Sequence, residues 1–494
     1  MKELPTFPAL YEINTRVWLR QFDSPGQRAT LEKVPSEYWD RLSHMGIHII
    51  WLMGVWETNQ SSIEKYGSHP SVIEGYRKAL PDFKKADVIG SPYAIDDYRL
   101  NPALGNLDGL KKIREDLNQK GMLLFLDFIP NHFNADSHLI QEHPEFFIQG
   151  NKSLYQKSAL TFFKHKGTNS FFAHGRDPYF PPWIDTVQVN YFHPDTRRFM
   201  IQKLVELAEI SDGVRCDMAM LVLNSIFKET WNHVLDEMGY KDPQEEFWDQ
   251  AIKAVKSKFP GFIFMGEVYW GKEGTLQEMG FDFTYDKSLT DFMENGNANQ
   301  IRKHLETTKP VQPRSVHFIE NHDEERAVRK FGKEKSLVGA VTISTLPGLR
   351  FFHDGQFEGK MIKLPVQLGR EPKETVQEDI QSFYHRLLSI TKNPVFTSGE
   401  WTLLESLSAG EGDGSHQNIL IWIWGYQQEK RLVTVNFSNH VCRCRVFLNF
   451  KENHGDLTFS DLLNHQTYTR KADDLQKNGL FIELERYQSH IFSF

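Results

Sequence analysis

The sequence predicts an α/β protein built on a (β/α)8 barrel, followed by a C-terminal β domain. Three observations lead to this fold class. Apolar, strand-length segments alternate with helix-like segments as far as about residue 392, and beyond that point strands joined by turns take over. The segments at 46–52 and 121–127 are continuous apolar runs, as expected for parallel strands buried on both faces. An open doubly wound sheet is the alternative, and it is disfavoured because no glycine-rich dinucleotide turn follows the first segment.

Eight strand candidates precede residue 392. In order, they span residues 11–19, 46–52, 121–127, 213–217, 262–267, 281–285, 315–319 and 349–353. Helical spacing occurs between several of them, at residues 30–45, 106–120, 194–210 and 224–258. Residues 57–91 are polar and irregular, which indicates an excursion out of the core. This alternation is typical of a barrel whose strand ends carry the functional groups.

The barrel is predicted to be interrupted once and then followed by a second domain. Between residues 133 and 188 regular periodicity fades, and so long a segment without it indicates a small inserted subdomain after the third strand. The barrel therefore comprises residues 1–132 and 189–392. Residues 393–494 are predicted to form an antiparallel β-sandwich, with strand candidates at 419–425, 431–437, 442–450 and 479–485.

Composition excludes several classes of partner. The formal net charge is −8 over 494 residues, so we expect no nucleic acid and no anionic membrane surface as a partner. No apolar run reaches the length of a membrane span, and the N-terminus lacks a signal-peptide pattern. Three cysteines without metal-ligand spacing predict a reducing compartment, and hence a cytoplasmic protein.

The predicted chemistry depends on residues 213–217, which read Gly-Val-Arg-Cys-Asp. Arg215 and Asp217 are two positions apart, so a strand directs both side chains to one face. A guanidinium beside a carboxylate keeps it ionised and able to attack an electrophilic carbon. A structural ion pair is the alternative for this short motif alone. A catalytic role for Arg215 and Asp217 is favoured over an ion pair because Asp127, Glu267 and Asp323 also follow apolar runs.

Two kinds of reaction use carboxylates, histidines and an arginine at strand ends: metal-assisted hydrolysis and glycoside cleavage. A barrel metal site usually carries His-x-His after the first strand, and Asn14-Thr15-Arg16 at that position weakens the metal interpretation. Glycoside cleavage needs one ionised and one protonated carboxyl group. Arg215 would keep Asp217 ionised, whereas burial and the charge on Asp217 would raise the pKa of Glu267. Asp323 would then oppose the positive charge that develops on the sugar.

Four segments, in this order, resemble those of the α-amylase family of retaining α-glycoside enzymes, glycoside hydrolase family 13. They read DFIPNH at residues 127–132, GVRCD at 213–217, GEV at 266–268 and FIENHD at 318–323. SPYAIDDY at residues 91–98 also resembles the family's segment after the second barrel strand. The similarity runs from about residue 11 to residue 359 and implies a barrel with a C-terminal β domain.

The resemblance implies a role for each matching residue. For catalysis, Asp217 matches the nucleophile, Glu267 the acid/base and Asp323 the transition-state stabiliser. Three residues match positions that bind the sugar: Tyr93 lies beneath it, and His132 and His322 hydrogen-bond to it. Arg215 matches the residue that positions the nucleophile, and Asp127 matches a supporting carboxylate.

Departures from the family pattern bear on substrate and cofactor. Met220-Leu221 stand where well-studied endo-amylases carry Lys-His. Asn131 matches a calcium-ligand position, but a complete ligand set is not evident, so we expect no cofactor to be required. The resemblance implies retaining hydrolysis of α-glucosidic bonds in α-glucans or oligosaccharides, through a covalent glycosyl-aspartate. A 4-α-glucanotransferase, or another α-glucosyl transferase, is one alternative, and a non-catalytic carbohydrate-binding relative is the other.

Overall fold

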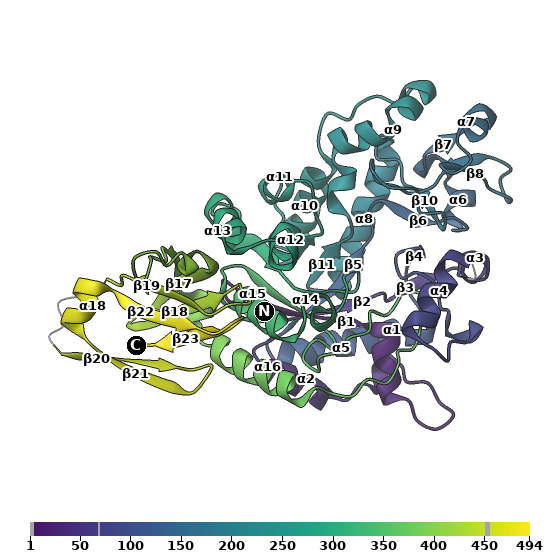
Figure 1. Cartoon of the computed structure of the whole chain (residues 1–494). Coiled ribbons are helices and arrows are strands. Elements are labelled where there is room, and N and C mark those ends of the chain that lie inside the picture. The colour runs from purple at the N-terminus through teal and green to yellow at the C-terminus, as the bar shows by residue number, and fades with distance from the viewer. Residues whose placement is uncertain (1–3, 68–69, 450–454) are drawn as a thin grey trace.

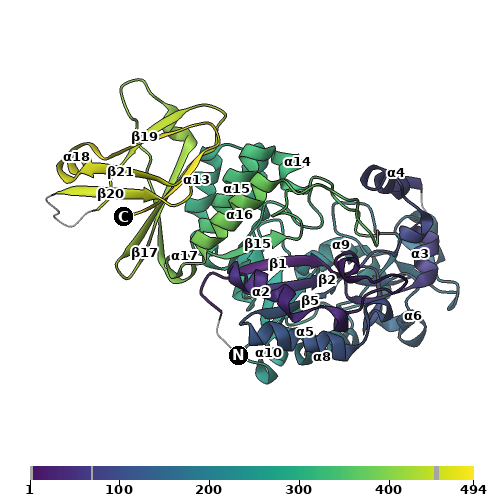
Figure 2. The same ribbon diagram turned by 90° about the horizontal axis from the view of Figure 1, so that it is seen from below.

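The computed structural model describes residues 4–67, 70–449 and 455–494. The barrel lies in the centre of the molecule, with the C-terminal β domain at one end (Figure 1). Two elaborated barrel loops lie at the opposite end, and a view turned by 90° shows the same arrangement (Figure 2). Among the described residues, no helix combines the length and apolar character needed to cross a bilayer.

Eight parallel strands close the barrel, as the sequence predicts. In order around it they are β1 (Ala9–Asn14), β2 (Ile49–Met53), β5 (Leu123–Phe128), β11 (Gly213–Cys216), β12 (Ile263–Gly266), β13 (Phe283–Tyr285), β14 (Ser315–His317) and β15 (Leu349–His353). The first strand is shorter than predicted. It ends at Asn14, and helix α1 (Thr15–Trp18) follows where the sequence predicts strand to residue 19, because Arg16 turns away to bond three loop carbonyls.

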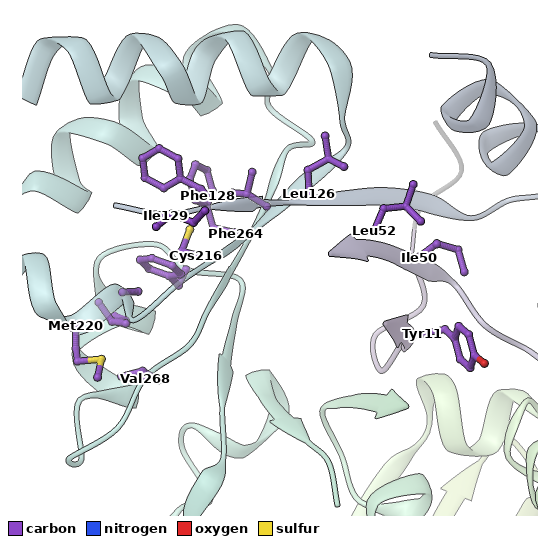
Figure 3. Close-up of a cluster of buried hydrophobic side chains, with 14 of the residues drawn as sticks. Tyr11, Ile50, Leu52, Leu126, Phe128, Ile129, Cys216, Met220, Phe264 and Val268 are labelled. Atoms are coloured by element: carbon purple, nitrogen blue, oxygen red, sulfur yellow. The ribbon is translucent and has the colours of Figure 1, made fainter. Parts of the chain in front are cut away.

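Alternate residues of these strands enter two separate cores. Ile49, Trp51 and Phe125 belong to the layer inside the barrel. Ile50, Leu126 and Phe264 belong to the larger core between the strands and the surrounding helices, part of which Figure 3 shows. Because side chains alternate along a strand, residues 127 and 215 continue the inward set, and the two are direct register partners. The register therefore directs their polar side chains to the inside of the barrel at its carboxyl end.

Helices cover the outside of the barrel. They are α2 (Ser36–His44), α5 (Leu107–Gln119), α8 (Pro194–Ile210), α9 (Asn224–Met238), α10 (Phe247–Lys258), α11 (Glu273–Glu278), α12 (Lys287–Asn295), α13 (Ala298–Thr307), α14 (Ala327–Phe331), α15 (Lys333–Thr345), α16 (Glu378–Thr391) and α17 (Pro394–Ser398). The single helical stretch predicted at 224–258 is two helices. Gly239 ends the first at φ 73°, a left-handed conformation that suits glycine at a helix C-terminus.

Two barrel loops carry structure of their own. The excursion after β2 contains β3 (Trp56–Thr58), α3 (Gln60–Tyr66) and α4 (Pro70–Ala79), and β4 (Ile95–Leu100) pairs with β3. The insertion after β5 contains β6 (His132–Asn134), α6 (Leu139–Glu142), β7 (Gln149–Gly150), α7 (Lys152–Lys157), β8 (Phe162–Lys164), β9 (Phe171–Ala173) and β10 (Thr186–Gln188). Strands β6 and β10 pair antiparallel, so the entry and exit of the insertion lie side by side.

The C-terminal domain is an antiparallel sandwich of unequal sheets. The larger sheet has the order β16 (Glu400–Leu404), β17 (Ile419–Tyr426), β18 (Glu429–Asn436), β23 (Ser489–Ser493), β20 (Asp456–Asp461) and β21 (Gln466–Lys471). The smaller pairs β19 (Cys442–Val446) with β22 (Leu480–Leu484), and α18 (Ala472–Asn478) precedes β22. The strand predicted at 442–450 ends at Val446, and residue 450 lies outside the described residues. The prediction missed β16, β20, β21 and β23.

Candidate active site

Arg215 joins the two carboxylates on which the predicted chemistry depends. Its Nη1 donates to Asp217 Oδ1 at 2.5 Å, and its Nη2 donates to Glu267 Oε2 at 2.6 Å. β11 and β12 are neighbouring parallel strands, so residues that follow their last positions meet at one rim. Both carboxylates are therefore held by one guanidinium at the carboxyl end of the barrel.

Aromatic rings enclose that guanidinium. Its Cζ lies 5.1 Å from the ring centroid of Trp51, 5.3 Å from that of Tyr93 and 5.8 Å from that of Tyr285. One layer below, a Cβ on Gly213 would lie 2.4 Å from the Phe125 ring, so only glycine leaves room for that ring in the barrel interior. This packing holds Arg215 in one position, and the guanidinium in turn orients the carboxylates.

Glu267 accepts hydrogen bonds at both oxygens. Oε2 accepts from Arg215 and from the backbone N–H of Met218 at 2.8 Å, and Oε1 accepts from the Tyr269 hydroxyl at 2.6 Å. Met218 reaches this position with φ 42°, a left-handed conformation that costs free energy for a residue other than glycine. The backbone beside Asp217 is thus strained, and both oxygens of Glu267 are hydrogen-bonded.

Burial raises the pKa of Asp217 and of Glu267 above their ordinary values, and the Arg215 charge opposes this rise at both carboxyls. The charges of Asp217 and Asp323 raise the pKa of Glu267 further. Asp217 accepts a hydrogen bond from Arg215, which favours its ionised form. Burial and the charge of Asp323 therefore raise the pKa of both carboxyl groups, and the Tyr269 hydrogen bond opposes the rise at Glu267.

Both ring nitrogens of His322 contact polar groups of the protein. Its Nδ1 hydrogen-bonds to Glu12 in β1, and its Nε2 lies 2.8 Å from the Tyr93 hydroxyl and 3.0 Å from Asp323 Oδ2. The Tyr93 and His322 rings also stack, with centroids 5.2 Å apart. Burial alone would lower the pKa of His322, but the carboxylates of Asp323 and Glu12 outweigh burial and raise it well above its ordinary value. His322 is thus held as a cation.

Asp323 is the most open of the three predicted catalytic carboxylates. Its side chain is 54% exposed, against 10% for Asp217 and 4% for Glu267. Desolvation alone would raise the pKa of Asp323, but the neighbouring His322 cation holds it well below its ordinary range. Asp323 is therefore an anion that faces solvent at the mouth of the site.

Asp127 lies beneath the site and is fully buried. Its Oδ1 accepts from the Trp51 indole at 3.2 Å, and its Oδ2 accepts from the Gly54 backbone N–H at 2.8 Å. Burial raises the pKa of Asp127 to about 7. With both oxygens used by the protein, Asp127 fits the supporting role better than direct contact with a substrate.

His132 stands at the entry to the insertion. Burial lowers its pKa to about 4, so it is neutral near pH 7. Its ring contacts that of Trp183, with centroids 5.2 Å apart. His132 also hydrogen-bonds to the backbone of Tyr93, so this neutral imidazole lies next to the segment that carries the Tyr93 ring.

Asn131, which matches a calcium-ligand position of the family, hydrogen-bonds to a protein donor instead. Gln188 Nε2 donates to Asn131 Oδ1 at 3.0 Å, to the Asn131 carbonyl at 3.0 Å and to the Val189 carbonyl at 3.1 Å. Gln188 is fully buried. The described residues contain no group of His, Cys, Asp and Glu side chains that could hold a metal ion. The oxygens that would face a cation instead face an amide N–H group, so this position does not fit calcium.

Sequence reasoning missed several residues of the site. Glu12, fully buried, was detectable as the one charged residue at the start of an apolar segment. Tyr269 carried only the signal of lying two residues after Glu267, and Gln188 only its place in residues 187–190, a segment in which members of the resembling family often differ with specificity. Met220 and Leu221, at the departure from the family pattern, are buried in a short 3-10 helix. They therefore offer no polar group to the site.

Fold and site together define a (β/α)8-barrel protein with a carboxylate centre at the carboxyl ends of its strands. A family model described as "Alpha amylase, catalytic domain" matches residues 36–406, and the chain belongs to that family.

Named relatives are distant. Alpha-amylase MalA of Haloarcula japonica is 22% identical over 439 residues, which cover 87% of this chain but 55% of MalA. Alpha-amylase 3 of Dictyoglomus thermophilum is 24% identical over 398 residues, covering 74% of this chain and 68% of that protein. The chain thus spans little more than half the length of MalA. A solved maltogenic alpha-amylase, AmyB from Thermotoga neapolitana, shares the fold with a TM-score of 0.69 and 20% identity over 99% of each chain.

Proposed function

We propose that this protein cleaves α-glucosidic bonds of α-glucans or oligosaccharides with retention, through a covalent glycosyl-Asp217 intermediate. The observation that carries the proposal is the single buried Arg215 that holds Asp217 and Glu267 at adjacent strand ends. Retaining cleavage needs a nucleophile and a proton donor close to one anomeric carbon. The family membership and the two relatives named as alpha-amylases support a glucan as substrate.

In the first step, Glu267 protonates the glycosidic oxygen while an Asp217 oxygen attacks the anomeric carbon, so that the bond to the leaving sugar breaks. The hydrogen bonds indicate which oxygen carries the proton. Oε2 accepts from Arg215 and from Met218 N–H, whereas Oε1 faces a hydroxyl, Tyr269, that can accept as well as donate. When Glu267 is protonated, the proton is therefore on Oε1, and the Tyr269 hydroxyl, which donates to the ionised form, can then accept.

In the second step, Glu267 removes a proton from the incoming acceptor, and the acceptor oxygen displaces Asp217. Asp323, an anion at the mouth, stabilises the positive charge on the sugar in both transition states. Tyr93 and His132 supply the walls beneath and beside the ring. Water as acceptor gives hydrolysis, and a second sugar gives transfer.

Incubation with maltoheptaose tests the proposal. We expect shorter oligomers from the wild-type protein and none from the Asp217→Asn variant, with thermal unfolding as the check that the variant is folded. Products longer than maltoheptaose would establish a glucanotransferase instead. Equal product formation by both proteins would remove Asp217 as the nucleophile, and no product from either would favour a carbohydrate-binding protein without catalysis.

We propose further that activity needs no calcium and that the protein works in a reducing compartment such as the cytoplasm. The Gln188 amide at the Asn131 position supports the first proposal. The second is supported by Cys216, Cys442 and Cys444, which are all buried, free thiols. Prolonged treatment with a chelator should leave the turnover rate unchanged.

A further inference from the structure

Three large aromatic side chains near the catalytic rim are exposed to solvent, and the proposed mechanism gives them no role. Tyr179 is 61% exposed, Phe180 64% and Trp270 38%. Tyr179 and Phe180 belong to the insertion after β5, whereas Trp270 belongs to the loop after β12. The rings of Tyr179 and Trp270 are in contact, with centroids 4.9 Å apart. We call these three residues the aromatic patch; exposed apolar patches often mark a surface that binds a partner or ligand.

The aromatic patch lies on the Glu267 side of the site. Loops that follow parallel barrel strands emerge at one rim, and β5, β11 and β12 are neighbours in that order. The contact between Tyr179 and Trp270 therefore joins the two loops that flank Asp217, which follows β11. Trp270 directly follows Tyr269, whose hydroxyl donates to Glu267 at 2.6 Å. The patch is thus next to the proposed proton donor.

The insertion holds its two aromatic residues in a fixed turn. One oxygen of Asp177, a buried side chain, accepts from the backbone N–H groups of Tyr179 at 2.7 Å and of Phe180 at 2.9 Å. Pro178 precedes the pair and Pro181-Pro182 follow it, so the backbone torsion angles are restricted on both sides. Because the turn is ordered in advance, little conformational entropy is lost when a ligand contacts these rings.

The loop after β12 presents Trp270 in a strained conformation. Its φ is 63°, in the left-handed region that is unfavourable for a residue other than glycine. The planes of the Trp270 and Tyr179 rings are 86° apart, so one ring meets the other by its edge. At least one face of each ring is therefore left uncovered by the other.

The segment after Asp217 offers a leaving sugar no polar side chain. Because Glu267 protonates the oxygen of the departing sugar, that sugar lies on the Glu267 side. Residues 218–223 read Met-Ala-Met-Leu-Val-Leu and carry no hydroxyl, amide or charged side chain. A glucose ring has C–H groups on its faces and hydroxyls at its edge, and stacking against those faces is the interaction that exposed aromatic rings provide.

We propose that Trp270 and Tyr179 form a platform on which a glucose ring stacks on the leaving side of the cleaved bond, with Phe180 extending the platform. The inference rests on the proposed function, since Glu267 defines which side is the leaving side. Trp270 then determines how well the leaving portion of a substrate is bound, and it takes no part in the chemistry at the anomeric carbon.

Two substrates separate the leaving side from the rest of the site. Maltoheptaose places glucose rings on both sides of the cleaved bond, whereas α-maltotriosyl fluoride has only fluoride on the leaving side. We expect Trp270→Ala to lower kcat/KM for maltoheptaose at least about fivefold and to keep kcat/KM for α-maltotriosyl fluoride within about twofold of the wild type, since only the stacking contact is lost. Trp270→Phe, which keeps a ring, should lose less. The matched control is Phe481→Ala, which removes an aromatic ring of similar exposure, 37%, from the C-terminal domain and should behave as the wild type does.

Two results from a Trp270→Ala variant that unfolds as cooperatively as the wild type would overturn the proposal. Equal losses on both substrates would show a general effect on the site. Unchanged kcat/KM for maltoheptaose would show that no sugar stacks there, and a changed oligomeric state in light scattering would then make the patch a contact between copies of this chain. If the wild type cleaves neither substrate, the proposed function fails, and calorimetric titration with maltoheptaose decides whether the patch binds sugar. Weaker binding by Trp270→Ala than by the wild type supports the platform, and equal or absent binding in both overturns it.

Discussion

Replacing Gln188 by Asp should convert a protein-filled position into a calcium site. The shorter side chain moves its terminal group back by about 1.5 Å, one carbon–carbon bond, and so leaves room where Nε2 now lies. The Asn131 amide oxygen and the carbonyls of Asn131 and Val189, which now accept from Nε2, would face that space with the new carboxylate. Oxygen ligands of this kind are those that calcium prefers.

The magnitude follows from the hydrogen bonds that are lost. The Asn131 carbonyl keeps its bond from the Val189 N–H at 3.0 Å, so Asn131 Oδ1 and the Val189 carbonyl are the buried acceptors that lose their donor. The Arg176 N–H, which donates to Gln188 Oε1 at 3.3 Å, also loses its partner, but this bond is only partly buried. A buried acceptor left without a donor costs about 1–3 kcal/mol, and two give about 3 kcal/mol in the metal-free variant. At about 2 °C for each kcal/mol in a large domain, the melting temperature should fall by roughly 6 °C.

The assay is thermal unfolding of the wild type and the variant, each with chelator and with millimolar calcium. We expect calcium to raise the melting temperature of Gln188→Asp and to leave the wild type unchanged. Gln277→Asp is the matched control, since Gln277 is also buried and donates to Thr284 and to the Val311 carbonyl. The control should lose stability without any response to calcium. Stabilisation of the wild type by calcium would refute the reasoning, as would a variant that does not respond.

Three further predictions concern the catalytic centre. Asp217→Asn should lower kcat on maltoheptaose by about 10^4-fold or more at unchanged fold, because no nucleophile remains; a loss below tenfold would contradict the assignment. Glu267→Gln should reduce turnover of maltoheptaose far more than that of 4-nitrophenyl α-glucoside, whose leaving group needs no proton, and equal losses on both would remove Glu267 as the acid. Glu12→Gln should move the alkaline limb of the kcat/KM profile to lower pH. The Glu12 carboxylate raises the pKa of His322, so its removal lets the cation deprotonate at lower pH, and an unmoved limb would show that His322 does not need its charge.

Much of the fold could be predicted because barrel strands carry a local signal. Segments such as Ile49–Met53 are apolar on both faces, since one face meets the barrel interior and the other the helices. The end of the first strand could not be predicted this way. Residues 17–19 are apolar again, but Arg16 donates to loop carbonyls more than seventy positions away, and no local pattern records that. Strand β21 was missed for a different reason, since its edge position leaves it polar and mostly exposed.

In the site, the spacing of residues along the chain predicted which side chains lie together where those residues belong to one strand. Arg215 and Asp217 share a face because they are two positions apart, and the structure joins them at 2.5 Å. The partners of these groups were out of reach. Tyr269 and Gln188 make contacts that no sequence spacing sets, whereas Glu12 was visible only as a charge in an apolar segment, without its partner.

The sequence alone determined the eight segments that form the barrel strands, the residue types that follow them and hence the family to which the chain belongs, because hydrophobic period and short motifs are local properties. Only the tertiary structure decided that one guanidinium serves both Asp217 and Glu267, that Glu12 charges His322, and that the Gln188 amide fills the position next to Asn131. The physical reason is that pKa values and hydrogen-bond partners depend on burial and on distances of a few ångströms, and only the folded chain establishes these.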